Sequence, residues 1–309
     1  MNAEDENFIP LQFNSSMKGR FKLIRRKADT LEITEETPWI NNVILNQGLE
    51  RFGTGSIADY CKVGTNNAAP LTAQTALLGF VAATSTVQST TVSARATAPY
   101  YGRAVRTYRF ATGVAAGTLA EVGVGWATGN AANTLWCRAL ILDAGGNPTT
   151  ITVLSDEVLD VAYELRIYPD LVDKVFQVTI SGNLYDCILR AADVLSTASW
   201  GTNLFSGFLA SGVPYVYNGA LGAITTLPSG VLSAPSPVNP TVAPYAPGTL
   251  YRQYEANWGL DQGNLAGGIS AWLMPSNVGA YKVSFSPAIP KTNVQVLKLT
   301  ARLSWGRYP

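Results

Sequence analysis

Short apolar runs alternate with turn clusters through residues 104–168. The runs are rich in Val, Ile, Leu, Thr, Tyr and Trp, and the clusters between them hold Gly, Asn, Asp and Pro. This alternation is typical of consecutive antiparallel strands. A meander of this size is not stable alone, so we expect a second layer to cover its apolar face. The predicted strands are residues 103–111, 120–127, 134–142, 150–153 and 158–168, with turns at 112–117, 128–133 and 143–148.

The chain before this region starts with a charged pattern. Residues 20–27 (RFKLIRRK) alternate basic and apolar positions, and residues 28–39 (ADTLEITEETPW) carry acidic ones. A hairpin between them would place opposite charges across the two strands. A basic strip for nucleic acid is the alternative, but aromatic residues are not interleaved and acidic residues lie nearby. Residues 1–19 show no clear period and are expected to form an N-terminal arm.

Two short helices are expected near residues 42–53 and 72–79. In the first, Asn41 or Asn42 is the candidate N-cap and Gly53 the candidate terminator. Gly48 inside this helix costs about 1 kcal/mol relative to Ala, which predicts close packing against a strand. In the second, Thr72 is the candidate cap. Residues 59–63 and 80–93 read as further strands.

The second half of the chain returns to a strand pattern on both sides of a proline-rich stretch. Ser181-Gly182-Asn183 predicts a hairpin turn between strands 174–180 and 185–190. Residues 228–249 must be extended because proline is so frequent there, either as a linker or as an arm lying on a sheet or on a neighbouring subunit. Strands are then expected at residues 250–260, 268–274, 280–286 and 295–304.

These elements predict a mainly β fold. The expected architecture is an antiparallel β-sandwich, jelly-roll-like or a meander, with one or two short N-terminal helices and an extended Pro-rich arm. We expect residues 20–227 to form the main β-rich domain and 228–249 the arm. The strands in residues 250–309 are expected to complete the second sheet.

Composition restricts the function classes. Of the 309 residues, 47% are hydrophobic and only 14% are charged, with a formal net charge of +1. The hydrophobic fraction is large enough to form a core. The net charge is too small to attract nucleic acid or an anionic membrane by long-range electrostatics. The acidic start MNAEDENF is unlike a signal peptide, and no apolar run reaches 18 residues. We predict no membrane insertion and no nucleic-acid partner.

The chain lacks the residues on which common catalytic chemistry depends. It has no histidine, which removes the commonest general base and metal ligand together. Cys61, Cys137 and Cys187 are far apart and show no zinc spacing, so we interpret them as buried, reduced core residues. We predict no catalytic residue, no metal site and no cofactor, and the sequence leaves the binding residues unknown.

Three motifs resemble sites but fail in detail. Gly123-Val124-Gly125 lacks the third glycine of a dinucleotide loop, because Thr128 stands in its place and no helix is expected to follow. Residues 143–147 (DAGGN) lack the ligand spacing of a calcium loop and read as a turn. A glycosidase needs two carboxylates, which the cluster Asp156, Glu157 and Asp160 could supply. The segment is more typical of a solvated loop that enters a strand.

Aromatic residues leave two interpretations open. The seven tryptophans could stack on sugars, but such residues more often fill cores or subunit interfaces. If the chain binds glycan, Tyr215, Tyr217 and Trp272 are candidate exposed contacts. Burial of the tryptophans would remove that interpretation.

Six stretches stand out in order along the chain: WINNVILNQGLERFGTG (39–55), VGTNNAAPLTAQTAL (63–77), LAEVGV (119–124), LWCRALI (135–141), FSPAIPKT (285–292) and SWGR (304–307). Taken in this order, they resemble a family of tailed-bacteriophage virion proteins. That family, of tail, tail-fibre or baseplate components, combines a Gly-Leu helix, a glycine loop followed by a short helix, a Glu-Val-Gly strand and an Ala-Leu strand. This chain departs where Asn66 and Asn67 replace the usual second glycine, and where Gly125-Trp126 follows Val124 in place of a frequent phenylalanine.

The resemblance implies a non-enzymatic structural protein of the virion. We expect a symmetric homo-oligomer that contacts other tail, neck, baseplate or fibre-attachment proteins and is synthesised in the host cytoplasm. A receptor-binding protein that contacts host surface glycan is the alternative. A polysaccharide-degrading enzyme would need two carboxylates converging in a groove.

Overall fold

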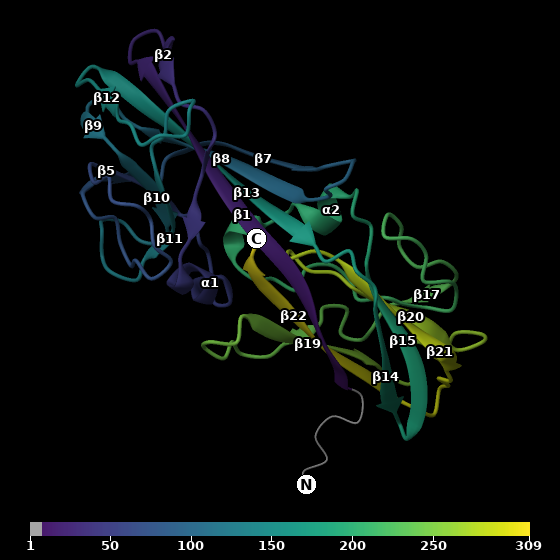
Figure 1. Cartoon of the computed structure of the whole chain (residues 1–309). Helices are drawn as coiled ribbons and strands as arrows, with labels where there is room; N and C mark the ends of the chain where they lie inside the picture. Colours follow the sequence, from purple (N-terminus) through teal and green to yellow (C-terminus); the bar gives the residue numbers. More distant parts are fainter. Residues whose placement is uncertain (1–7) are drawn as a thin grey trace.

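The computed structural model describes the backbone of residues 8–309 and the side chains from residue 13 onward. Its longest element is β1 (Phe8–Lys27), which crosses the molecule as one continuous strand (Figure 1). A nine-stranded sheet forms around β1 in the order β18-β19-β22-β1-β13-β8-β7, and two short strands also pair with β1. These strands are β18 (Thr241–Val242), β19 (Tyr251–Trp258), β22 (Leu297–Arg307), β13 (Glu157–Pro169), β8 (Gly102–Phe110), β7 (Val87–Ala94), β2 (Ile33–Glu36) and β3 (Ile40–Asn41).

Strand β1 is long because it has partners along its whole length. Its first half pairs in parallel with β22, and residues 15–27 pair antiparallel with β13. Its side chains alternate with a period of two, with Phe13, Met17 and Phe21 buried and Lys18 and Arg20 on the opposite face. One strand therefore links the two ends of the molecule.

A five-stranded sheet covers one end of the long sheet (Figure 1). The two sheets meet where the Trp136 indole N–H donates to the Tyr163 hydroxyl across 2.7 Å, in the core. A separate two-stranded ribbon lies at the same end. The sheet runs β4 (Val43–Ile44), β11 (Leu135–Leu140), β10 (Glu121–Gly125), β5 (Tyr60–Gly64) and β6 (Phe80–Thr84), and the ribbon pairs β9 (Gly117–Leu119) with β12 (Ile151–Val153).

A six-stranded sheet packs against the other end of the long sheet. Trp272 of this sheet contacts Tyr254 and Trp258 of β19, and Tyr281 contacts Phe13 of β1. The molecule is thus built from two sandwiches that share one long sheet. The six strands, in order, are β14 (Lys174–Ile180), β15 (Asn183–Ala191), β21 (Tyr281–Ile289), β20 (Ile269–Met274), β16 (Val216–Tyr217) and β17 (Leu232–Ser233).

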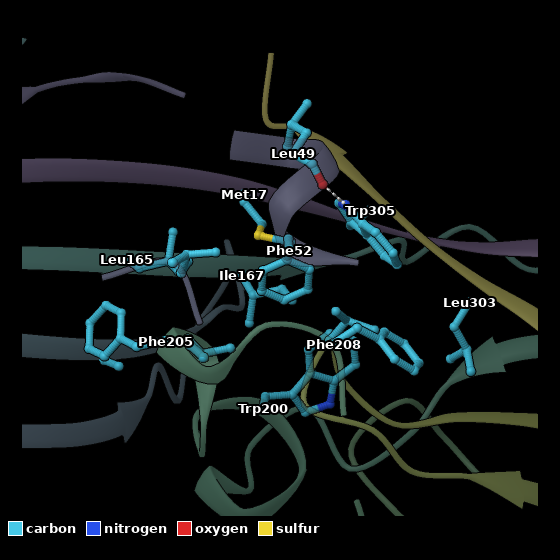
Figure 2. Close-up of a cluster of buried hydrophobic side chains, with 14 of the residues drawn as sticks. Met17, Leu49, Phe52, Leu165, Ile167, Trp200, Phe205, Phe208, Leu303 and Trp305 are labelled. Atoms are coloured by element: carbon cyan, nitrogen blue, oxygen red, sulfur yellow. Dashed lines mark hydrogen bonds between the residues drawn. The ribbon is translucent and has the colours of Figure 1, made fainter. Parts of the chain in front are cut away.

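Short helices fill the junction between the two sandwiches. These are α1 (Asn46–Phe52), α2 (Thr197–Trp200) and the 3-10 turn η1 (Leu204–Ser206). Figure 2 shows Phe52, Phe208 and Trp305 packed here, with the Trp305 indole N–H donating to the Leu49 carbonyl across 2.9 Å. The core is continuous through this junction.

The mainly β class is confirmed, and one of the two expected N-terminal helices is present as α1. The strands predicted in residues 104–168 all exist within two residues of the expected bounds, but they do not form one meander. β8 and β13 join the long sheet, β10 and β11 the five-stranded sheet, and β9 pairs with β12. Since β10 and β11 are buried on both faces, nothing in their side-chain pattern indicated which layer they join.

The late strands are also divided. β19 and β22 extend the long sheet, whereas β20 and β21 lie in the six-stranded sheet opposite them. They therefore supply both layers of the second sandwich, and the cover over β8 and β13 comes from the five-stranded sheet. The predicted hairpin turn is confirmed, with Ser181 at φ 48° and Gly182 at φ 78°.

The second predicted helix, residues 72–79, is wrong. Its backbone groups bond elsewhere: the Leu77 N–H to the Asn130 side chain, and the Gly79 N–H to the Glu121 carboxylate across 2.6 Å. The carbonyl of Thr72 accepts from the Asn46 N–H. Tertiary partners thus replace the helical hydrogen bonds.

The first helix is shorter than predicted and starts at Asn46. Neither Asn41 nor Asn42 caps it, because both lie at the short strands β3 and β4, and Leu45 precedes the helix without a side-chain cap. Gly48 does pack closely, since a Cβ there would lie 2.4 Å from the Trp136 carbonyl oxygen.

The predicted N-terminal arm is wrong for residues 8–19, which belong to β1, and residues 1–7 lie outside the described range. The Pro-rich stretch 228–249 is extended and adds two short pairs, β17 to the six-stranded sheet and β18 to the long sheet. The Tyr245 ring packs on Trp305 and its hydroxyl donates to Glu50 across 2.7 Å. The stretch was expected to be either a linker or an arm on a sheet or a neighbouring subunit. In the structure it lies on the sheets of its own chain.

Candidate binding surfaces

The glycine motif and the DAGGN loop serve the fold. Gly123 lies in β10, where a Cβ would be 2.5 Å from the Cys137 carbonyl oxygen, so the strand needs a small residue. The Asp143 carboxylate accepts the Asn147 backbone N–H across 2.9 Å and closes a turn. That hydrogen bond lowers the pKa of Asp143. Both interpretations, strand and turn, are confirmed.

The acidic cluster is only partly a solvated loop. Asp156 is exposed, but Glu157 and Asp160 lie in β13 and are buried. Asp160 accepts from Arg26 across 2.8 Å and from Arg109 across 2.6 and 2.7 Å. The prediction of a solvated segment is wrong for these two carboxylates, because neighbouring strands supply arginines that neutralise them.

Most aromatic side chains and all three cysteines are in the core. Burial raises the pKa of Cys137 and of Cys187 to about 12, which disfavours the reactive thiolate. Trp272 and Tyr217 are buried and Tyr215 is half-buried, so the candidate glycan contacts Tyr217 and Trp272 are wrong. Trp39 and Trp126 are partly exposed. The other five tryptophans are buried: Trp136, Trp200, Trp258, Trp272 and Trp305.

Residues from three of the sequence motifs meet in one buried polar cluster. Glu121 of the LAEVGV stretch and Arg138 of LWCRALI form an ion pair of 2.6 Å on the outer face of the five-stranded sheet, with both side chains fully buried. The loop from VGTNNAAPLTAQTAL covers them, and its Gln74 side chain accepts from Arg138 across 3.1 Å. Three of the motif stretches therefore meet at one buried ion pair.

The basic strand is neutralised by acidic partners from Lys22 to Lys27. Lys22 pairs with Glu36 across 2.8 Å, Arg25 with Glu35 across 3.4 Å, and Arg26 with Asp160. The predicted hairpin of opposite charges is confirmed by β1 and β2. A basic strip for nucleic acid finds no support here, because its charges are already paired.

One end of the second sandwich presents apolar surface. We call it the hairpin end: the β14–β15 hairpin and the loop 290–296, at the lower right of Figure 1. A cavity of about 320 Å³ opens there between Ile180, Tyr185, Ile289 and Val296. Such a cavity can accept a side chain of another molecule.

β14 has a free edge and an exposed valine, and further exposed valines lie before it and in the loop 290–296. Val175 is 77% exposed, and Val172, Val294 and Val296 are exposed to a similar degree. β14 is the outer strand of its sheet, pairs only with β15 among the described strands, and contains no proline. An apolar edge of this kind favours pairing with another chain.

Sequence reasoning did not find this surface. The alternation in residues 174–190 predicted the hairpin. The sequence pattern, however, does not distinguish a valine exposed to solvent from one covered by another part of the protein. The one available signal was Val175, an apolar residue on the otherwise polar outer face of β14.

No family model matches the chain, and searches of curated proteins and of solved structures found no match either. In residues 8–309, no helix has the length and apolar character needed to cross a membrane. The same part of the chain holds no group of three or more His, Cys, Asp or Glu side chains placed to bind a metal ion.

Proposed function

We propose that this chain is a non-enzymatic structural component of a tailed-phage virion, located in the tail, baseplate, neck or fibre attachment. It acts by assembling with copies of itself and with other virion proteins. The observation that carries the assembly role is the free edge of β14, on which Val175 is exposed. The ordered motif resemblance supports the virion role.

A second copy of the chain is the occupant that fits the hairpin end. Two β14 edges related by a two-fold axis would pair antiparallel and join two six-stranded sheets. Val175 and its symmetry mate would then leave water together, and burying one valine stabilises by roughly 1.5 kcal/mol or more. The same contact would satisfy the outer backbone groups of both strands.

A charge on this edge tests the assembly role. Val175→Lys should convert an oligomer into a monomer in sedimentation velocity. Val92→Lys is the matched control, because Val92 is also an exposed valine on an outer strand, β7, of a different sheet. A monomeric wild-type chain at tens of micromolar, or an oligomer unchanged by Val175→Lys, would contradict the proposal.

A test of the virion role requires whole particles. Electron cryomicroscopy of particles with a tagged copy of this chain should show it at symmetric positions on the tail, baseplate or neck. Particles that are complete in its absence would refute that role.

A further inference from the structure

A pocket on the exposed face of the long sheet gathers an excess of positive charge. It has a volume of about 110 Å³ and is lined by Lys18, Arg20, Asn41, Arg166 and Tyr168, together with the backbone at residue 19. A water molecule needs roughly 10–15 Å³ of such space, so the pocket accepts a group of several heavy atoms.

One carboxylate lies beneath this pocket and holds three guanidinium groups. Glu164 is 1% exposed and accepts from Arg20 across 2.8 and 3.0 Å, from Arg166 across 2.5 Å and from Arg103 across 3.3 Å. Burial acts to raise the pKa of Glu164, but the hydrogen bonds from Arg20 and Arg166 outweigh it and lower the pKa overall. Glu164 therefore stays ionised and orients the arginines.

The pocket still carries uncompensated charge. Three guanidiniums share the single Glu164 carboxylate, and Lys18 makes no ion pair with any described side chain. The Lys18 ammonium lies 5.9 Å from the centre of the Tyr308 ring. Elsewhere on β1 the cations have partners of their own, as Lys22 has Glu36. The excess is thus confined to one place and does not form a strip.

The ring of Tyr168 lines the same pocket, and the rings of Tyr308 and Trp39 contact residues that line it. Tyr168 stacks on Tyr308 with ring centres 3.9 Å apart, and the Arg20 guanidinium lies 4.4 Å from the centre of the Trp39 ring. Tyr308 and Trp39 are both more than a third exposed. A ligand whose charged group enters the pocket can place a ring against Tyr308.

We infer that this pocket binds an acidic saccharide unit, with its carboxylate or phosphate held by Lys18, Arg20 and Arg166 and its ring against Tyr308. The inference does not depend on the assembly role, because the pocket and the hairpin end use different sheets and different residues. It also differs from a nucleic-acid strip, which would need cations free along the strand.

Titration of the full chain with glucuronate, glucose and inorganic phosphate tests the inference, using ligand-observed NMR and calorimetry. Glucuronate should bind, glucose should not, and phosphate should bind more weakly because it lacks a ring. Binding of glucuronate should weaken as salt is added. No binding of glucuronate, or binding no tighter than that of phosphate, would overturn the assignment.

Three variants localise the site. Lys18→Gln should reduce glucuronate affinity about tenfold, since it removes a charged contact. Lys22→Gln, on the same strand and face, should leave the affinity unchanged. Tyr308→Ala should weaken glucuronate binding and spare phosphate. Because Lys18 has no ion pair to lose, its variant should keep the wild-type melting temperature, and equal affinity in the Lys18 and Lys22 variants would overturn the inference.

Discussion

Arg138 donates its Nε–H to the Glu121 carboxylate across 2.6 Å, and neither side chain is exposed to solvent. The same carboxylate accepts the backbone N–H groups of Leu78 and Gly79. One buried ion pair therefore joins two adjacent strands to the loop that covers them. Its stability depends on every partner being present.

Replacing one member of this pair should be severe. Glu121→Ala leaves the Arg138 charge buried without a counter-ion and two loop N–H groups without an acceptor, so we expect a loss of about 3–5 kcal/mol in unfolding free energy. Urea denaturation measures it. The double variant Glu121→Leu, Arg138→Met should be more stable than Glu121→Ala, because no isolated charge remains. A single variant within 1 kcal/mol of wild type would contradict this account.

Gly48→Ala should destabilise the protein even though alanine favours a helix by about 1 kcal/mol. The added Cβ would lie 2.4 Å from the backbone carbonyl oxygen of Trp136, and neither element can move easily. Gly306→Ala is the control, because a Cβ there meets no atom within 4 Å. Thermal unfolding compares the two, and a Gly48→Ala melting temperature at or above that of Gly306→Ala would refute the packing argument.

Lys62 should make stability depend on pH in the alkaline range. Burial lowers its pKa from 10.5 to about 8, so between these values the unfolded state holds one proton more than the native state. Its contribution to stability therefore rises as pH increases from about 8 to 10.5 and is constant below that range. Lys62→Met removes the effect, and the stability advantage of this variant over wild type should shrink between pH 8 and 10. An advantage that is constant or grows with pH would contradict the sign.

Tyr245 should hold the Pro-rich stretch on the body of the protein. Its ring packs against Trp305 and Gly53, and its hydroxyl bonds to Glu50. Tyr245→Ala should increase proteolytic cleavage within residues 228–249 before global unfolding. Val238→Ala, at an exposed position in the same stretch, should not. Equal cleavage of both variants would mean that other contacts hold the stretch.

Local sequence pattern was sufficient to place most strands and the turns at residues 143–147 and 181–183. Alternation and turn residues located β8, β10, β11, β13 and the four late strands within a few residues, because these signals act between near neighbours. The close packing at Gly48 was also predicted from a local signal, because glycine inside a helix lowers its stability unless close packing requires it. The helix at residues 72–79 failed because its propensity was overridden by partners far along the chain.

The sequence alone determined that this protein is mainly β and where most of its longer strands lie. The tertiary structure alone decided which sheet each strand joins, since strands buried on both faces carry no signal for their layer. It also decided that Glu121 meets Arg138, that three arginines share Glu164, and that Val175 faces outward on a free edge. Each of these depends on strand order and register between residues far apart in the chain, which no local pattern encodes.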